Sequence, residues 1–137
     1  MTELELDAAG LTVRRAVLGD DHVDRSLATA TEFSGPWQEF VTHVAWGTVW
    51  TRPGLERRTR SMLTIALLAA LRCEAELAQH LRAALRVGVT PAEIREVLLH
   101  TAVYAGVPAA NTAFTVASEV LGTLGDGTAD PPGPEAA

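Results

Sequence analysis

Lysine is absent from this chain of 137 residues, and cysteine occurs only once. All eleven basic residues are therefore arginines, which excludes any mechanism that forms a Schiff base on a lysine amine. The single thiol, Cys73, excludes an internal disulfide and a dithiol redox pair. A chain without structural disulfides is typical of a reducing compartment.

A basic surface and a membrane segment are lacking as well. Six of the seventeen acidic residues lie in the two terminal segments, where no base occurs, so eleven acids face eleven bases in the body of the chain. This balance argues against a nucleic-acid partner. The N-terminus has no hydrophobic signal core, and the longest apolar run, residues 62–71, is about half of a membrane span. We expect a soluble cytoplasmic protein with no membrane partner.

Aromatic residues make up only 5% of the chain and strand signals are weak throughout, so a core of leucine, alanine and valine in helices is predicted. Residues 1–20 are expected to be irregular or briefly helical. About six helices are predicted in all, and those with defined bounds cover residues 21–31, 34–49, 56–71, 74–87, 91–105 and 108–124. The fold class is therefore all-α, with one domain over residues 1–124 and a disordered tail over residues 125–137.

Three local signals set the bounds of these helices. Ser34 followed by Gly-Pro-Trp reads as a cap with proline in the first turn, and Arg52-Pro-Gly ends that helix. Gly88 is a typical residue just after a helix. Thr90-Pro-Ala-Glu93 is a capping box, which is a strong signal for a helix start.

Glu76 and His80 are spaced by four residues and so share one face of a helix, with Cys73 one turn earlier. A half-buried histidine beside a carboxylate is a proton donor or acceptor suited to neutral pH. The same spacing also fits an exposed helix pair of little energetic weight. Metal binding is a third interpretation, but two ligands without a third support it weakly, and no metal is expected.

His43, Trp46, Gly47 and Trp50 form a second stripe at helical spacing. Packing of the two tryptophans in the core is one interpretation, and walls of a binding cavity are the other. Gly47 speaks against packing alone, because glycine inside a helix costs about 0.5–1 kcal/mol relative to alanine. We therefore expect another helix or a ligand to approach the backbone closely at Gly47.

The arginines that follow this stripe have two possible roles. Arg57 and Arg58 fit a solvated charge run, whereas Arg60 leads into the apolar segment beside Ser61. An arginine near a buried cavity is suited to hold a carboxylate. Asn111, in the first turns of the last helix, either satisfies local backbone groups or helps to present an anion site.

Five segments together form a pattern that is more specific than any single motif: RRAVLGDDHVDRS (residues 14–26), HVAWGTVWTRPGL (43–55), RTRS (58–61), ELAQHLRAA (76–84) and EIREVLLHTAVYAGVPAANTAF (93–114). They resemble the carboxymuconolactone decarboxylase family over roughly residues 13–121. The resemblance implies an all-α, alkylhydroperoxidase D-like bundle of about six helices that assembles as a homo-oligomer, a trimer or a hexamer.

The wider superfamily includes thiol peroxidases with a Cys-x-x-Cys-x-x-x-His motif. On this chain the first cysteine of that motif falls on Cys73 and the histidine on His80, but the second cysteine position holds Glu76. Because the dithiol is missing, a thiol peroxidase activity fails on chemical grounds. Two further interpretations stay open: a decarboxylase-like protein that acts on a different lactone, and a non-catalytic oligomeric scaffold.

The resemblance implies a small carboxylated lactone as substrate: a γ-carboxylated butenolide with an acetate side chain, from the protocatechuate branch of the β-ketoadipate pathway. Loss of CO₂ sends the electron pair into the conjugated lactone carbonyl, so no cofactor and no metal are expected. In this interpretation His80 donates the proton and Glu76 orients it, while Arg60 or Arg52 binds a carboxylate or the enolate oxygen. The remaining substrate contacts are assigned to Trp46, Trp50, His43, Ser61 and Asn111.

Overall fold

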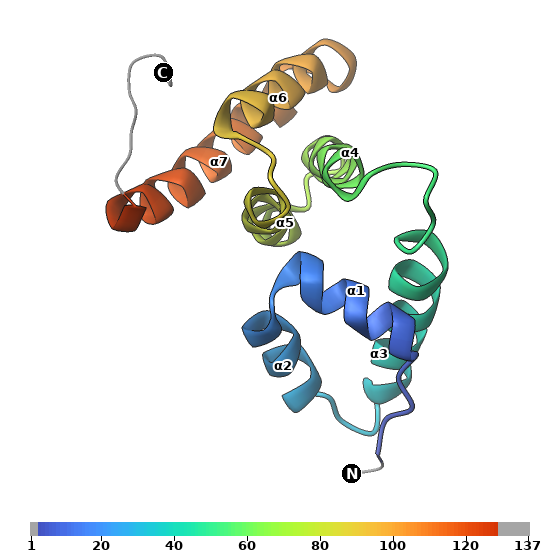
Figure 1. Cartoon of the computed structure of the whole chain (residues 1–137). Coiled ribbons are helices and arrows are strands. Elements are labelled where there is room, and N and C mark those ends of the chain that lie inside the picture. Colours follow the sequence, from blue (N-terminus) through green and yellow to red (C-terminus); the bar gives the residue numbers. More distant parts are fainter. Residues whose placement is uncertain (1–2, 129–137) are drawn as a thin grey trace. The chain divides into compact units, whose positions relative to one another are not determined.

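A computed structural model describes the backbone of residues 3–128 and the side chains of residues 3–124. Within this range the chain is entirely helical, with seven α-helices, one π-helix and no strand (Figure 1). The elements are α1 (Ala8–Leu18), α2 (Asp20–Ala28), α3 (Gly35–Val41), the π-helix η1 (Thr42–Val49), α4 (Arg57–Ala70), α5 (Glu74–Arg86), α6 (Pro91–Ala105) and α7 (Val107–Thr128). The all-α prediction is confirmed.

The two ends of the helical region differ from the prediction. Residues 8–18 form a full helix of 11 residues, where only an irregular or briefly helical segment was expected. At the other end, α7 continues to Thr128, beyond the predicted end at about residue 124. Residues 129–137, which make up most of the predicted disordered tail, lie outside the described residues.

The predicted helix over residues 34–49 exists but changes type halfway. It is an α-helix to Val41 and a π-helix from Thr42 to Val49, as the hydrogen bond from the Trp50 N–H to the Ala45 carbonyl five residues back shows (3.0 Å). Ser34 occupies the cap position, but its hydroxyl accepts the Thr31 N–H (2.9 Å) instead of capping the helix. π-Helical turns are rare and are frequent at functional sites, which directs attention to η1.

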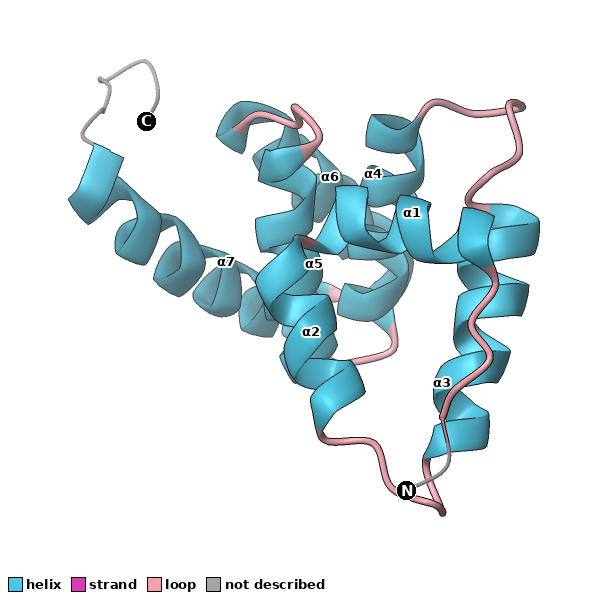
Figure 2. Cartoon of the chain, turned by 60° about the horizontal axis from the view of Figure 1, so that its bottom comes forward, coloured by secondary structure: helices cyan, strands magenta, loops and turns pink. Residues whose placement is uncertain are grey.

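The chain divides into two compact units, with the boundary between Arg57 and Arg58. In the first unit, α1 packs against η1 and α2, and α3 packs against η1 (Figure 2). Gly19, at φ 93°, separates α1 from α2, and Asp20 and Asp21 follow in the first turn of α2, where the helix dipole favours acids. The prediction of a single domain over residues 1–124 stays a prediction.

The second unit is built around an aliphatic core. Eleven buried residues form it: Ile65, Ala69, Leu77, Leu81, Ala84, Val89, Ile94, Leu98, Ala113, Ala117 and Val120. Helices α6 and α7 lie side by side in Figure 1 and pack against each other. The predicted capping box at the start of α6 is confirmed, because the Glu93 N–H donates to Thr90 Oγ1 (3.1 Å) and the Thr90 N–H donates to Glu93 Oε1 (2.9 Å).

The length and polarity of the helices bear on a membrane role. Among the described residues, none of the helices is both long enough and apolar enough to cross a bilayer.

Candidate active site

The residues predicted to form the site fall into two groups, one in each unit. His43, Trp46, Trp50 and Arg52 belong to the first unit, and Arg60, Ser61, Glu76, His80 and Asn111 belong to the second. Each group has its own local geometry.

The π-helix η1 carries the first group. The Trp46 and Trp50 rings contact each other, with centroids 4.9 Å apart and planes inclined by 33°. Trp46 is buried and Trp50 is half-buried, so Trp46 packs in the interior and Trp50 keeps an accessible surface. Arg52 lies exposed in the turn after η1, where its N–H donates to the Val49 carbonyl (3.0 Å).

The close approach predicted at Gly47 is confirmed, and the approaching element is α1. A Cβ atom at position 47 would lie 2.6 Å from Asp7 Oδ2. On the facing helix, a Cβ atom at position 10 would lie 2.9 Å from the Gly47 nitrogen and closer still to the Thr42 carbonyl oxygen. The two glycines therefore allow the backbones of α1 and η1 to approach more closely than side chains would permit.

Asp7 links the two elements at this contact. Its Oδ2 accepts the Gly10 N–H (2.8 Å), which makes Asp7 the N-cap of α1. Its Oδ1 lies 3.6 Å from His43 Nδ1, which is the distance of an ion pair and is slightly too long for a hydrogen bond. The first unit thus contains a carboxylate beside an imidazole, a pairing that no sequence pattern predicted.

Arg14 is a second unpredicted residue at the contact between α1 and η1. Its side chain is buried, and its Nη1 donates to Gln38 Oε1 (2.9 Å) and to Thr42 Oγ1 (3.1 Å). Burial lowers the pKa of the Arg14 guanidinium, and the neighbouring charge of Arg15 lowers it further. No sequence signal marks Arg14, because arginine is rarely buried, whereas Asp7 is a recognisable N-cap residue before the Ala-Ala-Gly turn.

In the second unit, the first turns of α4 place polar atoms in the interior. Ser61 is fully buried, and its Oγ has no hydrogen-bond partner among the described residues. Arg60 is half-buried, its Nε is buried, and its carbonyl accepts the Thr64 hydroxyl (2.8 Å). Ser61 precedes Ile65 of the core by one turn, so these polar groups border the aliphatic core.

His80 and Glu76 lie on α5, one turn apart as predicted. His80 is half-buried and its Nδ1 atom is buried. Glu76 is exposed and makes no hydrogen bond or ion pair within the described part of the chain. The expected orienting bond from Glu76 to His80 is therefore not formed here, although bonds at active sites often tighten only when the substrate binds.

Arg58 is not part of a merely solvated charge run, which corrects one interpretation of the sequence. Its guanidinium forms an ion pair with Glu93 at the start of α6, with Nη1 3.1 Å from Oε1. A hydrogen bond from the Thr90 backbone lowers the pKa of the Glu93 carboxyl, and the bond from Arg58 lowers it further. This pair ties α4 to α6, while Arg57 remains exposed.

Asn111 and Cys73 have mainly local contacts. Asn111 is exposed near the start of α7, and its carbonyl accepts the Thr115 hydroxyl (3.2 Å). Cys73 is a half-buried free thiol at the N-cap position of α5, with Sγ 3.8 Å from the Leu71 carbonyl.

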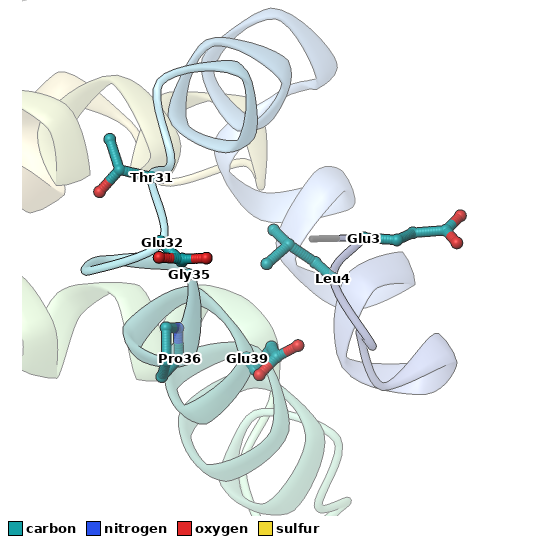
Figure 3. Close-up of a pocket in the computed structure, with 7 residues that line it drawn as sticks. All are labelled: Glu3, Leu4, Thr31, Glu32, Gly35, Pro36 and Glu39. Carbon is teal, nitrogen blue, oxygen red and sulfur yellow. The ribbon is translucent and has the colours of Figure 1, made fainter. Parts of the chain in front are cut away.

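Each unit contains a cavity that none of the predicted site residues lines. A cavity of about 240 Å³ in the first unit is lined by Glu3, Leu4, Thr31, Glu32, Gly35, Pro36 and Glu39 (Figure 3). Three glutamates are unfavourable for an anionic ligand, because like charges repel. A cavity of about 200 Å³ in the second unit lies against α6 and α7 and is lined mainly by apolar residues, with Arg95 and Ser118.

Comparisons with known proteins bear on what these residues do. The family model described as the carboxymuconolactone decarboxylase family matches residues 35–119. The chain is 52% identical over 116 residues to 4-carboxymuconolactone decarboxylase of Acinetobacter baylyi, covering 85% of this chain and 87% of the relative. It is 45% identical over 117 residues to nitrosuccinic acid decarboxylase npaB of Metarhizium robertsii, covering 85% and 82%. A 4-carboxymuconolactone decarboxylase of Pseudomonas putida is 51% identical over 47 residues, covering 34% and 98%.

Proposed function

Since this chain belongs to the carboxymuconolactone decarboxylase family, we propose that it decarboxylates 4-carboxymuconolactone to the β-ketoadipate enol-lactone without a cofactor. One observation carries the proposal: the identity of 52% to a 4-carboxymuconolactone decarboxylase over 85% of this chain. In the proposal, the reaction is a step of protocatechuate catabolism in the cytoplasm, and the single cysteine fits that compartment.

The chemistry of the substrate explains why the protein needs no electron-accepting group of its own. The bond to the leaving carboxylate breaks, CO₂ departs, and the electron pair enters the lactone carbonyl through the conjugated alkene. A proton then adds to the α-carbon and gives the enol-lactone. The protein has to hold the acetate carboxylate, desolvate the carboxylate that leaves, stabilise the developing oxyanion and deliver one proton.

The proposed roles follow from residue chemistry. His80 delivers the proton and Glu76 orients it once the substrate is bound; the buried Nδ1 of His80 supports a fixed ring. Arg60 or Arg52 binds a carboxylate or the enolate oxygen. The remaining contacts involve the tryptophan walls, which exclude water, and three hydrogen-bonding side chains: Trp46, Trp50, His43, Ser61 and Asn111.

A second candidate function is the decarboxylation of a different dicarboxylate, which the identity of 45% to a nitrosuccinic acid decarboxylase favours. In nitrosuccinate the leaving carboxylate shares a carbon with a nitro group, which takes up the electron pair, and a second carboxylate is retained. Both candidate substrates thus combine an internal electron acceptor with a carboxylate that stays. The same protein groups serve either reaction, so a substrate comparison must distinguish the two.

The decisive experiment supplies the lactone in situ from a cycloisomerase and records CO₂ release, with nitrosuccinate as the competing substrate. We expect turnover of the lactone, and a loss of kcat/KM of about 10²–10⁴-fold in His80→Ala and in Arg60→Ala. Matched controls are His100→Ala and Arg82→Ala, which alter exposed residues of the same types on α6 and α5. Near-normal kcat/KM in both site variants would reject the assignment of the site.

We also propose that the chain forms a homo-oligomer, a trimer or a hexamer. The support is apolar surface on two helices of the second unit: Leu63, Leu67 and Leu71 recur every four residues on α4, and Leu99, Val103 and Tyr104 lie on α6. Each is about half exposed or more, and contiguous apolar patches on a soluble protein commonly mark contact surfaces. Sedimentation velocity measures the number of subunits directly.

A further inference from the structure

A carboxylate and an imidazole face each other where α1 meets η1. We propose that Asp7 is a positioning residue for His43: it holds the hydrogen of His43 on Nδ1 and so presents Nε2 to the substrate. The inference rests on the proposed function for the identity of the substrate, but the pair itself is a property of the first unit. Its geometry is independent of the residues on α4 and α5.

The Asp7 carboxylate is held in place before any ligand binds. One oxygen, Oδ2, accepts the Gly10 N–H at the start of α1 (2.8 Å). The other oxygen, Oδ1, lies 3.6 Å from His43 Nδ1. A carboxylate that caps a helix with one oxygen and faces an imidazole with the other fixes which ring nitrogen carries the hydrogen, because the partner of one nitrogen sets the role of the other.

Two glycines make this geometry possible. The position of a Cβ atom at residue 47 would be 2.6 Å from Asp7 Oδ2 and 3.2 Å from its Cγ, so any side chain there would displace the carboxylate. A Cβ atom at residue 10 would lie 2.9 Å from the Gly47 nitrogen and would push α1 away from η1. The cost of two glycines in helices is explained if the contact between Asp7 and His43 depends on them.

Arg14 fixes the same helix face farther along α1. Asp7, Gly10 and Arg14 are spaced by three and four residues, so they share one side of α1. The Arg14 guanidinium donates to Gln38 on α3 and to Thr42, the first residue of η1. With contacts at both ends, α1 is held against η1, and the register of Asp7 relative to His43 is defined.

His43 lies on the element that carries the predicted tryptophan walls. Its side chain is 68% exposed, which leaves Nε2 accessible to a small molecule. Trp46 and Trp50 follow on the same π-helix, and π-helical turns are frequent at functional sites. In contrast, Glu76 makes no hydrogen bond or ion pair within the described residues, so it holds no imidazole in this structure.

The first test is spectroscopic and needs no substrate. Nitrogen-15 NMR at about pH 8.5, where free imidazole is neutral, reports which ring nitrogen of His43 carries the hydrogen. We expect Nδ1–H in the wild type and a shift toward Nε2–H in Asp7→Asn, because asparagine keeps the helix cap but lacks the charge. Gly47→Ala, which displaces the carboxylate and leaves residue 7 unchanged, is expected to produce the same shift. His43→Gln identifies the signal.

The second test uses steady-state kinetics on the lactone. If Nε2 binds the substrate, Asp7→Asn raises KM by about 3- to 30-fold and changes kcat little, since uniform binding is lost. In a His43→Gln background, Asp7→Asn adds no further effect. Asp21→Asn, which removes the same charge at an exposed site on α2, serves as the matched control.

Several outcomes would overturn the inference. An unchanged His43 tautomer in both Asp7→Asn and Gly47→Ala would do so, and so would additive kinetic effects of Asp7→Asn and His43→Gln. If Asp7→Asn does not fold, as judged by helical circular dichroism, Gly47→Ala carries the spectroscopic test. A wild-type protein that shows the Nδ1–H tautomer but does not turn over the lactone contradicts the proposed function and leaves the pairing intact.

Discussion

The two units of the chain are held together by different interactions. The second unit has a core of eleven buried aliphatic residues contributed by α4, α5, α6, α7 and the segment before α6. In the first unit, the contact between α1 and η1 depends on an N-cap carboxylate, a pair of glycines and a buried arginine. The comparison teaches that the aliphatic unit provides graded stability, whereas the polar contact defines a geometry that single substitutions can disrupt.

The largest effect on stability is expected in the aliphatic unit. Leu98 is fully buried in the core, so Leu98→Ala removes apolar contacts and leaves a cavity. We expect the free energy of unfolding to fall by about 2–5 kcal/mol in urea titrations, while the folded variant keeps its kcat/KM. Leu55→Ala, at an exposed leucine in the loop before α4, is the matched control. A strong loss of activity per folded molecule would break the proposed division between the units.

A smaller loss of stability with a larger loss of activity is expected at Gly10. The Cβ atom of Gly10→Ala would meet backbone atoms of η1, which cannot move aside as a flexible side chain can. We expect a loss of about 1–3 kcal/mol from overpacking and a fall in kcat/KM of roughly 10-fold or more, because displacing η1 by a fraction of an ångström misplaces its side chains. The control is Gly122→Ala on α7, where a Cβ atom meets nothing within 4 Å.

The smallest effect is expected at the ion pair between Arg58 and Glu93, and it depends on pH. The pKa of Glu93 is lowered in the folded state, so its contribution to stability is present above its ordinary value of 4.5 and is lost as the pH falls through the lowered value. Glu93→Gln therefore flattens the acid side of a plot of unfolding midpoint against pH. Glu96→Gln, an exposed change on the same helix, is expected to leave the plot unchanged. An equal response of the two variants would show that the pair does not stabilise the unit.

Much of the helical architecture was predictable, because its signals are local. The Thr90 capping box, the break at Arg52-Pro53-Gly54 and the glycine after α5 appear where the sequence indicates them. The change from α-helix to π-helix at Thr42 was not predictable, because it depends on contacts with α1, which is far away in the sequence. The extent of α1 was underestimated for a similar reason, since the tertiary contacts of its Asp7, Gly10 and Arg14 face leave little local signal.

The candidate site was predictable in part. The close approach at Gly47 followed from the cost of glycine in a helix, but the sequence did not reveal that Asp7 is the group that approaches. Burial of Ser61 agrees with its place on the face that leads into the core. The spacing of Glu76 and His80 placed them on one face, but spacing does not determine whether a bond forms between them. Their catalytic roles remain predictions.

The facing glycines also constrain how this protein can evolve. A mutation that adds a side chain at position 10 or position 47 collides with atoms of the opposite helix, so neither site can drift while the other stays fixed in place. A lineage that enlarges one of them must first let α1 retreat, and the retreat carries the carboxylate away from the imidazole. We therefore expect the two positions to change together or not at all among descendants that keep the reaction.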